Sequence, residues 1–149
     1  MKSIIRFIKE NQEDIKKYSN IIVLNKNEDK VLILRKSRND KRFKNMWGFP
    51  GGSIEKTDKN GKEACIRELK EETGIELSWN ESFKCKKYDI IENPDGSISE
   101  YYLVVLEKNP EEITIKLSKE HSAFEWFDEN CIKKYRWLDS VFQIIQKVI

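Results

Sequence analysis

Three glutamates, Glu68, Glu71 and Glu72, are the residues of this chain whose spacing points most directly to chemistry. If the segment is helical, positions i, i+3 and i+4 share one face, about one turn apart. Carboxylates in that arrangement repel one another, and acidic residues in the last turn of a helix oppose its dipole. Hard divalent cations such as Mg²⁺ bind carboxylates together with substrate phosphates. The pattern therefore indicates a cation site, with a solvated acidic helix face as the alternative.

The residues around these acids favour the cation site. Gly51 and Gly52 follow Pro50 in a turn without Cβ atoms, where backbone can approach a ligand closely. Arg67 lies one turn before the second glutamate and can offset and orient the acids. Gly74 suits the left-handed residue that ends a helix. The opposite helix face carries an apolar stripe that can seat the helix on a core, made of Cys65, Ile66, Leu69 and Thr73.

This segment resembles the Nudix box, whose pattern is Gly, five residues, Glu, seven residues, Arg-Glu-apolar, one residue, Glu-Glu, one residue and Gly-apolar. Many members of that family also carry the upstream WGFPGG, which begins here at Trp47. Two departures fall in the loop: the family's loop Glu corresponds to Asp58, and the segment from Gly52 to Arg67 is one residue longer. Loops tolerate such changes, so the helix acids are unaffected. The matching residues are Gly52, Arg67, Glu68, Leu69, Glu71, Glu72, Gly74 and Ile75.

The Nudix resemblance implies a hydrolase that depends on Mg²⁺, with Mn²⁺ able to substitute, and that cleaves a diphosphate linkage in a nucleoside diphosphate joined to another group, X. It implies metal ligation by the Gly52 carbonyl and by the three helix glutamates, with Arg67 as a catalytic orienting partner. The compact chain and the WGFPGG entry resemble the MutT-like branch, which converts (d)NTPs to (d)NMPs and pyrophosphate. ADP-ribose, nucleotide sugars and dinucleoside polyphosphates are alternative substrates. A non-catalytic nucleotide or RNA-end sensor is a further alternative, and the complete set of helix acids favours the enzyme.

A general base is expected in the loop SKEHSAFEW, because many Nudix relatives place one after the later strands. Glu120 fits the family's loop acid best, since it precedes a short predicted strand by a few residues. Glu125 alternates with aromatic neighbours, which is also the pattern of a solvent-facing side chain. His121 is the only histidine of the sequence and is a conceivable proton shuttle. A lone loop histidine is more often a surface residue, so Glu120 is the predicted base.

Four further residues are predicted to contact the substrate. Arg35 is the preferred phosphate contact, at the start of a basic stretch that continues to residue 44. Trp47 and Phe49 are predicted to stack on a base, an interaction worth about 1–3 kcal/mol per base. Core packing is the alternative for Phe49. Glu55 follows the glycine pair and either reaches the site or faces solvent.

Composition is compatible with a single Nudix domain over residues 1–149 that acts on a nucleotide-type small molecule. Charged residues make up 36% of the chain but the net charge is only +2, which argues against stable nucleic-acid binding. The three cysteines, Cys65, Cys85 and Cys131, show no CxxC spacing and are typical of reduced thiols in a cytoplasmic protein. No apolar run is long enough for a signal peptide or a membrane span. Nudix proteins are often dimers, so a homodimer stays open.

The expected fold is α/β (α+β), with one mixed sheet covered on both faces, as in the Nudix α/β/α sandwich. Apolar periodicity and turn signals set the element boundaries. In the first half we predict an amphipathic helix over 3–18, a hairpin of strands 21–24 and 31–35, and a helix over 61–73. A connection with one short strand follows over 76–82, and strands 84–92 and 100–107 flank a turn at 93–96. The last part is predicted to hold a short edge strand or loop at 113–117, a strand at 124–127 and a mostly helical tail over 128–149.

Overall fold

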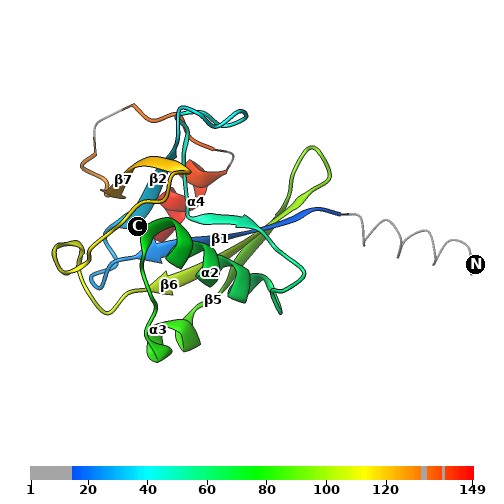
Figure 1. Ribbon diagram of the computed structural model, residues 1–149. Coiled ribbons are helices and arrows are strands. Elements are labelled where there is room, and N and C mark those ends of the chain that lie inside the picture. Colours follow the sequence, from blue (N-terminus) through cyan, green and yellow to red (C-terminus); the bar gives the residue numbers. More distant parts are fainter. Residues whose placement is uncertain (1–14, 132–133, 139) are drawn as a thin grey trace, which may run out of the picture.

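The computed structural model describes residues 15–131, 134–138 and 140–149. These residues form a mixed seven-stranded sheet with helices on both faces (Figure 1), which confirms the predicted fold class. None of the helices in the described part of the chain is both long and apolar enough to cross a membrane. In chain order the elements are β1 (Lys17–Leu24), β2 (Val31–Lys36), β3 (Trp47–Gly48), β4 (Gly51–Ser53), α2 (Gly61–Thr73), α3 (Trp79–Lys84), β5 (Lys86–Glu92), β6 (Ile98–Val105), the 3₁₀ turn η1 (Pro110–Glu112), β7 (His121–Phe127) and α4 (Val141–Val148).

Strand β1 lies at the centre of the sheet, whose order is β3-β2-β1-β6-β5. It runs parallel to β6 and antiparallel to β2, and the predicted hairpin is confirmed by the pairing of Leu24 with Val31. Two strands lie off this path, because β4 pairs with β1 and β7 pairs with β2. A central strand is covered on both faces, which explains why β1 ends in the continuous apolar run Ile21–Leu24.

The alternation of β1 side chains divides the interior into two cores. Ile21 and Val23 are fully buried on the face covered by α2. Ile22 and Leu24 point to the other face, where α4 packs through Ile145 and its neighbours. Successive strand residues point to opposite faces, so a strand that is apolar throughout can supply both cores. The sheet thereby fixes α2, the helix that carries the acidic residues, on one face only.

Helix α2 has the bounds that the sequence predicts, Gly61–Thr73, and both of its ends are capped. The side chain of Asn60 accepts a hydrogen bond from the backbone N–H of Glu63 at 2.9 Å. Gly74 ends the helix in the left-handed conformation, with φ 78°, and its N–H donates to Lys70 O at 2.9 Å. Cys65 lies on the buried face of this helix. All three cysteines are free thiols in the structure, which agrees with the predicted reduced state.

The predictions at the two ends of the chain are only partly met. Most of the predicted helix over 3–18 lies outside the described residues, but Lys17 and Tyr18 begin β1 and pair with β6. Those two positions are therefore strand, because the parallel partner continues to Ile98 and fixes them in the sheet. Among the described residues of the tail predicted to be mostly helical, Val141–Val148 alone forms a helix. The preceding backbone instead bonds to β3, where Trp47 N–H donates to Arg136 O at 2.7 Å.

One connection and one strand start also differ from the predictions, whereas a second connection, 113–117, is the loop that was one of its two predicted alternatives. The segment 76–82 contains the start of helix α3 rather than a strand, because Ser78 and Glu81 form a reciprocal capping box. Residues 113–117 form no strand, and their backbone follows the end of α2, with Lys116 N–H donating to Thr73 O at 2.9 Å. Strand β7 begins at His121, three residues before its predicted start.

Candidate active site

The three glutamates of α2 line one side of the helix but differ sharply in exposure. The side chain of Glu71 is 58% exposed and that of Glu68 is 13% exposed. Glu72 is 1% exposed and lies against the sheet. The cluster therefore extends from solvent into the interior, and its innermost carboxylate lies where a charge needs compensation. A fully solvated helix face would leave all three acids exposed, so the structure excludes that alternative.

Arg67 holds several carboxylates of this cluster in place. Its Nε and Nη2 donate to the two oxygens of Asp58 at 3.0 and 2.9 Å, a bidentate contact. Its Nη1 donates to Glu68 Oε1 at 3.1 Å and lies 3.3 Å from Glu71 Oε2. The Arg67 hydrogen bond holds the pKa of Asp58 below its ordinary value, and the same bond raises the pKa of Arg67. The predicted orienting role thus has a geometric basis, with Asp58 as the anchor.

Replacing Asp58 by asparagine is expected to lower the free energy of unfolding at pH 7 by about 1–3 kcal/mol, because Arg67 loses a charged acceptor. The depressed pKa of Asp58 means that this stabilisation is complete above the unfolded value near 3.8 and is lost as the pH falls below it. Urea unfolding should show a difference between wild type and Asp58→Asn at pH 7 that shrinks at pH 3. Asp89→Asn, at an exposed position of β5, is the control. An unchanged difference at pH 3 would refute the assigned charge pair.

The glycine pair brings backbone against the glutamates, as the sequence predicts. Gly51 N–H donates to Glu72 Oε1 at 2.9 Å. A Cβ built on Gly52 would lie 2.7 Å from Glu68 Oε1 and 2.9 Å from its Cδ, closer than side chains allow. Pairing of β4 with β1 fixes this approach, since Gly52 lies opposite Ser19 in the ladder. Residue 52 must therefore lack a side chain for Glu68 to occupy its position.

The electrostatics of Glu72 fit a bound cation. The pKa of Glu72 is raised to about 8, mainly by burial; the charges of Glu68 and Glu120 contribute to the rise, and the Gly51 N–H and the charge of Lys36 oppose it. Burial also raises the pKa of Glu68. Two desolvated carboxylates that lie against the backbone of Gly51 and Gly52 are ligands that Mg²⁺ and Mn²⁺ accept, and such an ion would restore the ionised forms. The donor set present therefore fits the divalent metal expected for this site.

The segment after η1 carries Glu120 to the same cluster. Its backbone bonds to the end of α2, where Ser118 N–H donates to Glu72 O at 3.1 Å. On its other side, Ser37 N–H donates to Glu120 O at 2.9 Å. As a result, one ligand atom from each of Glu72, Glu120 and His121 lies within 4.8 Å of the others. The predicted loop acid and the helix acids are thus neighbours.

His121 does not occupy the surface, contrary to the sequence-based expectation. It is the first residue of β7, pairs with Lys36 in β2 and is only 6% exposed. Burial and the charge of Lys36 lower its pKa to about 4, so the imidazole is neutral near pH 7. Local alternation could not have revealed this burial, because His121 shares its strand face with Glu125, which alternates with aromatic residues as a solvent-facing side chain does.

The two aromatic residues predicted to stack on a base lie in the core on the α4 side of the sheet. Trp47 is 9% exposed and contacts Tyr135 edge to face, with ring centroids 5.4 Å apart. Phe49 is 7% exposed and contacts Tyr101 in the same way at 6.1 Å. The structure gives both rings a packing role, so their predicted base contact is not carried into the proposed site.

The remaining predicted residues lie at different distances from the acids. Glu55 is 59% exposed and its carboxylate is 4.0 Å from Arg67, at the outer edge of the cluster. Arg35 donates from Nε to Ser122 Oγ at 3.0 Å and lies over the Trp47 ring. Its neighbour Lys36 is the cation that acts on both Glu72 and His121. Sequence reasoning preferred Arg35, but the electrostatics favour Lys36 as the cation beside the carboxylates.

Glu125, the other acid of the loop in which a general base was expected, forms a hydrogen bond with a distant residue. Glu125 accepts a hydrogen bond from the hydroxyl of Tyr135, so it does not simply face solvent.

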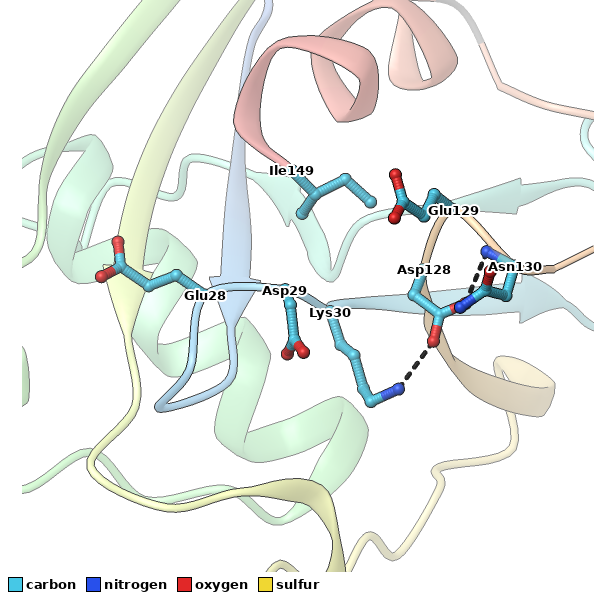
Figure 2. A pocket seen from close by; sticks show the side chains of 7 residues that line it. All are labelled: Glu28, Asp29, Lys30, Asp128, Glu129, Asn130 and Ile149. Atoms are coloured by element: carbon cyan, nitrogen blue, oxygen red, sulfur yellow. Dashed lines mark hydrogen bonds and ion pairs between the residues drawn. The ribbon is translucent and has the colours of Figure 1, made fainter.

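A separate pocket of about 260 Å³ lies near the β1–β2 turn (Figure 2). Lys30 lines this pocket, and its Nζ donates to Asp128 Oδ2 at 2.6 Å. Lys30 is the one cationic side chain among the described residues that line this pocket, and none of the α2 acids lines it. The lining residues are Glu28, Asp29, Lys30, Asp128, Glu129, Asn130 and Ile149.

Comparison with known proteins places this geometry in a family. The profile described as NUDIX domain matches residues 16–147. The m7GpppN-mRNA hydrolase of Saccharomyces cerevisiae is 28% identical over 119 residues, 80% of this chain and 11% of that protein. The 8-oxo-dGTP diphosphatase of Buchnera aphidicola is 36% identical over 75 residues, 48% of this chain and 55% of that protein.

A solved structure with the same fold is the bifunctional NMN adenylyltransferase/ADP ribose pyrophosphatase of Francisella tularensis, complexed with AMP and a manganese ion. Its TM-score is 0.72 at 25% identity, and the match covers 89% of this chain and 40% of that one. The chain thus spans about a tenth of the yeast relative and less than half of the Francisella enzyme. Because the family profile covers most of the sequence and the motif residues converge in space, the chain belongs to the NUDIX family, that of the Nudix hydrolases.

Proposed function

We propose that this domain is a Mg²⁺-dependent pyrophosphohydrolase that cleaves a diphosphate linkage in nucleoside diphosphate-X compounds, with (d)NTPs converted to (d)NMPs and pyrophosphate as the first choice. The observation that carries the proposal is the graded carboxylate cluster, in which Glu72 is buried, Glu68 lies over Gly52 and Glu71 faces solvent. Such an arrangement is costly without a cation, since within the described part of the chain the buried Glu72 carboxylate accepts a hydrogen bond from only one group, the Gly51 N–H.

Each residue of the cluster receives a role from its position. Glu68, Glu71, Glu72 and the Gly52 carbonyl hold the divalent metal, which would neutralise phosphate charge and lower the pKa of a water molecule when bound. Arg67, anchored by Asp58, keeps Glu68 and Glu71 oriented.

Glu120 is the proposed general base, because it is exposed and lies beside Glu72. It accepts a proton from the attacking water, whose oxygen bonds to one phosphorus while the bridging P–O bond to the leaving phosphate breaks. Lys36 is the proposed electrostatic contact for the substrate phosphates. Arg35 and Glu55 are proposed to contact the substrate at the outer edge of the carboxylate cluster.

Substrate preference is supported by the relatives, each of which acts on a phosphate anhydride according to its name. The 8-oxo-dGTP diphosphatase relative supports a nucleoside triphosphate. The Francisella enzyme supports ADP-ribose as an alternative. The yeast m7GpppN-mRNA hydrolase supports capped RNA ends as a second candidate, although the net charge of +2 gives little electrostatic attraction for RNA.

A hydrolysis screen tests the proposal. The protein is incubated with Mg²⁺ and (d)NTPs including 8-oxo-dGTP, ADP-ribose, nucleotide sugars, dinucleoside polyphosphates and a capped RNA oligonucleotide, and the products are separated by ion-exchange chromatography. We expect (d)NMP and pyrophosphate, abolished by EDTA and restored by excess Mg²⁺. Saturable nucleotide binding in calorimetry without turnover of any compound would instead support a nucleotide or RNA-end sensor.

A further inference from the structure

His121 lies in a position that the proposed chemistry does not explain. It opens β7, where the ladder with β2 is irregular between Arg35 and Lys36. Its backbone N–H donates to Ser118 O at 3.3 Å. This hydrogen bond ties the first residue of β7 to the loop that also carries Glu120. These contacts fix the imidazole in the interior, 94% buried, rather than in solvent.

The Nδ1 atom of His121 is buried without a hydrogen-bond partner among the described residues. Leaving a buried polar nitrogen unsatisfied costs about 1–3 kcal/mol, so such atoms in folded proteins call for an explanation. An apolar residue at the same strand position would avoid this cost. A histidine is therefore favoured at this position only if its Nδ1 binds something that the described residues do not provide.

The neighbours of the imidazole indicate what that partner is. One imidazole nitrogen lies within 4.8 Å of a carboxylate oxygen of Glu72 and of Glu120. Ligand atoms on opposite sides of a small divalent ion are about 4.2 Å apart, twice a bond of about 2.1 Å. The upper limit of 4.8 Å on the separations is close to this span, and the side chain of Glu120 is exposed. Two anionic oxygens and one nitrogen form a mixed donor set for one cation.

We propose that His121 supplies an imidazole nitrogen to a divalent cation held jointly by Glu72 and Glu120, on the side of Glu72 that faces β7. This inference rests on the proposed function for the presence of a cation. It adds a nitrogen ligand beside Glu72 of α2, and it gives one oxygen of Glu120 to the cation while the other stays available as the proposed proton acceptor. Imidazole suits transition metals, whereas carboxylates and carbonyls suit Mg²⁺. A nitrogen ligand therefore raises the affinity of the subsite for Mn²⁺ or Co²⁺ relative to Mg²⁺, compared with the same subsite without it.

The sequence allows a direct test, because His121 is the only histidine of the chain. Untagged wild-type protein is loaded with one equivalent of Mn²⁺ and studied by pulsed electron paramagnetic resonance, once with natural histidine and once with ¹⁵N-labelled histidine. We expect a nitrogen hyperfine coupling that changes from the ¹⁴N to the ¹⁵N pattern on labelling. No substitution is needed, so the result does not depend on the folding of a variant.

Metal preference provides the second measurement. Competition between Mn²⁺ and Mg²⁺ is followed through the signal of free Mn²⁺ for wild type, His121→Asn, Glu120→Gln and the control Lys119→Gln, whose exposed side chain lies one residue from the cluster. Losing a ligand or its immediate support typically costs 10–100-fold in metal affinity. We expect the Mn²⁺ preference to fall about tenfold in His121→Asn and to remain unchanged in Lys119→Gln. Circular dichroism confirms that each variant is folded.

The outcomes separate this inference from the proposed function. Bound Mn²⁺ without any labelling-sensitive nitrogen coupling overturns the role of His121 and leaves the oxygen-ligated enzyme intact. Absence of any bound Mn²⁺ or Mg²⁺ at millimolar concentration overturns both. An unchanged Mn²⁺ preference in folded His121→Asn also contradicts the nitrogen ligand.

Discussion

Glutamine in place of Glu72 is expected to reduce metal-dependent hydrolysis about a thousandfold, or about 4 kcal/mol of transition-state stabilisation, while the protein stays folded. The amide has the shape of the carboxylate, and its oxygen can still accept the Gly51 N–H that Glu72 accepts at 2.9 Å. It carries no charge to hold a cation. The measurements are kcat/KM with the substrate found in the screen and Mg²⁺ affinity by calorimetry.

A matched control for this substitution is available on the same helix. Glu63 is an exposed acid in the first turn of α2, and Glu63→Gln should leave kcat/KM within about twofold. Activity of Glu72→Gln within tenfold of wild type would contradict the assignment of Glu72 as the central metal ligand.

The same substitution should also remove a pH dependence of stability in the metal-free protein. The pKa of Glu72 is raised from 4.5 to about 8, so between these values the folded state binds a proton that the unfolded state does not. Stability from this group is therefore present below pH 4.5 and is lost as the pH rises towards 8, by an amount on the order of a few kcal/mol.

Urea unfolding in EDTA tests this expectation. Wild type should lose stability between pH 5 and pH 8 more steeply than Glu72→Gln. Saturating Mg²⁺ should restore the wild type at pH 8, because it binds only the folded state. Parallel pH profiles of the two proteins in EDTA would show that Glu72 is ionised without metal.

Alanine at Gly52 is the second large expected effect, a loss of about a hundredfold in kcat/KM with little change in stability. The added Cβ would lie 2.7 Å from Glu68 Oε1 and must displace that carboxylate. Misplacing a catalytic group by about 1 Å can cost a hundredfold in rate. The displaced atoms belong to the end of a flexible side chain, so the free energy of unfolding should change by less than about 1 kcal/mol.

Gly96→Ala provides the opposite control. Gly96 lies in the turn between β5 and β6 with φ 86°, and nothing lies within 4 Å of its added Cβ. The variant should lose about 1–2 kcal/mol of stability through backbone strain but retain kcat/KM. Thermal unfolding measures the stability of both alanine variants, and steady-state kinetics measures their kcat/KM. Equal activity losses in the two alanine variants would assign the Gly52 effect to strain instead of to Glu68.

Local sequence determined the features of this protein that depend on neighbouring residues. The bounds of α2 follow from an asparagine cap, an apolar stripe and a terminal glycine, all within one short segment. The hairpin of β1 and β2 follows from two apolar runs around a polar turn. The carboxylate cluster follows from helical spacing, since Glu68, Glu71 and Glu72 must share a face once the helix forms. The family is likewise a property of the sequence, since the NUDIX domain profile matches residues 16–147.

The tertiary structure decided how deeply each residue lies and which distant residues meet. Burial of Glu72 and exposure of Glu71 depend on how α2 is seated on the sheet, which helical spacing does not specify. Trp47 became a core residue because the segment around residue 137 pairs beside it. The meeting of Glu72 with His121 requires a loop whose backbone bonds both to α2 and to β2, a long-range pairing that no local pattern encodes.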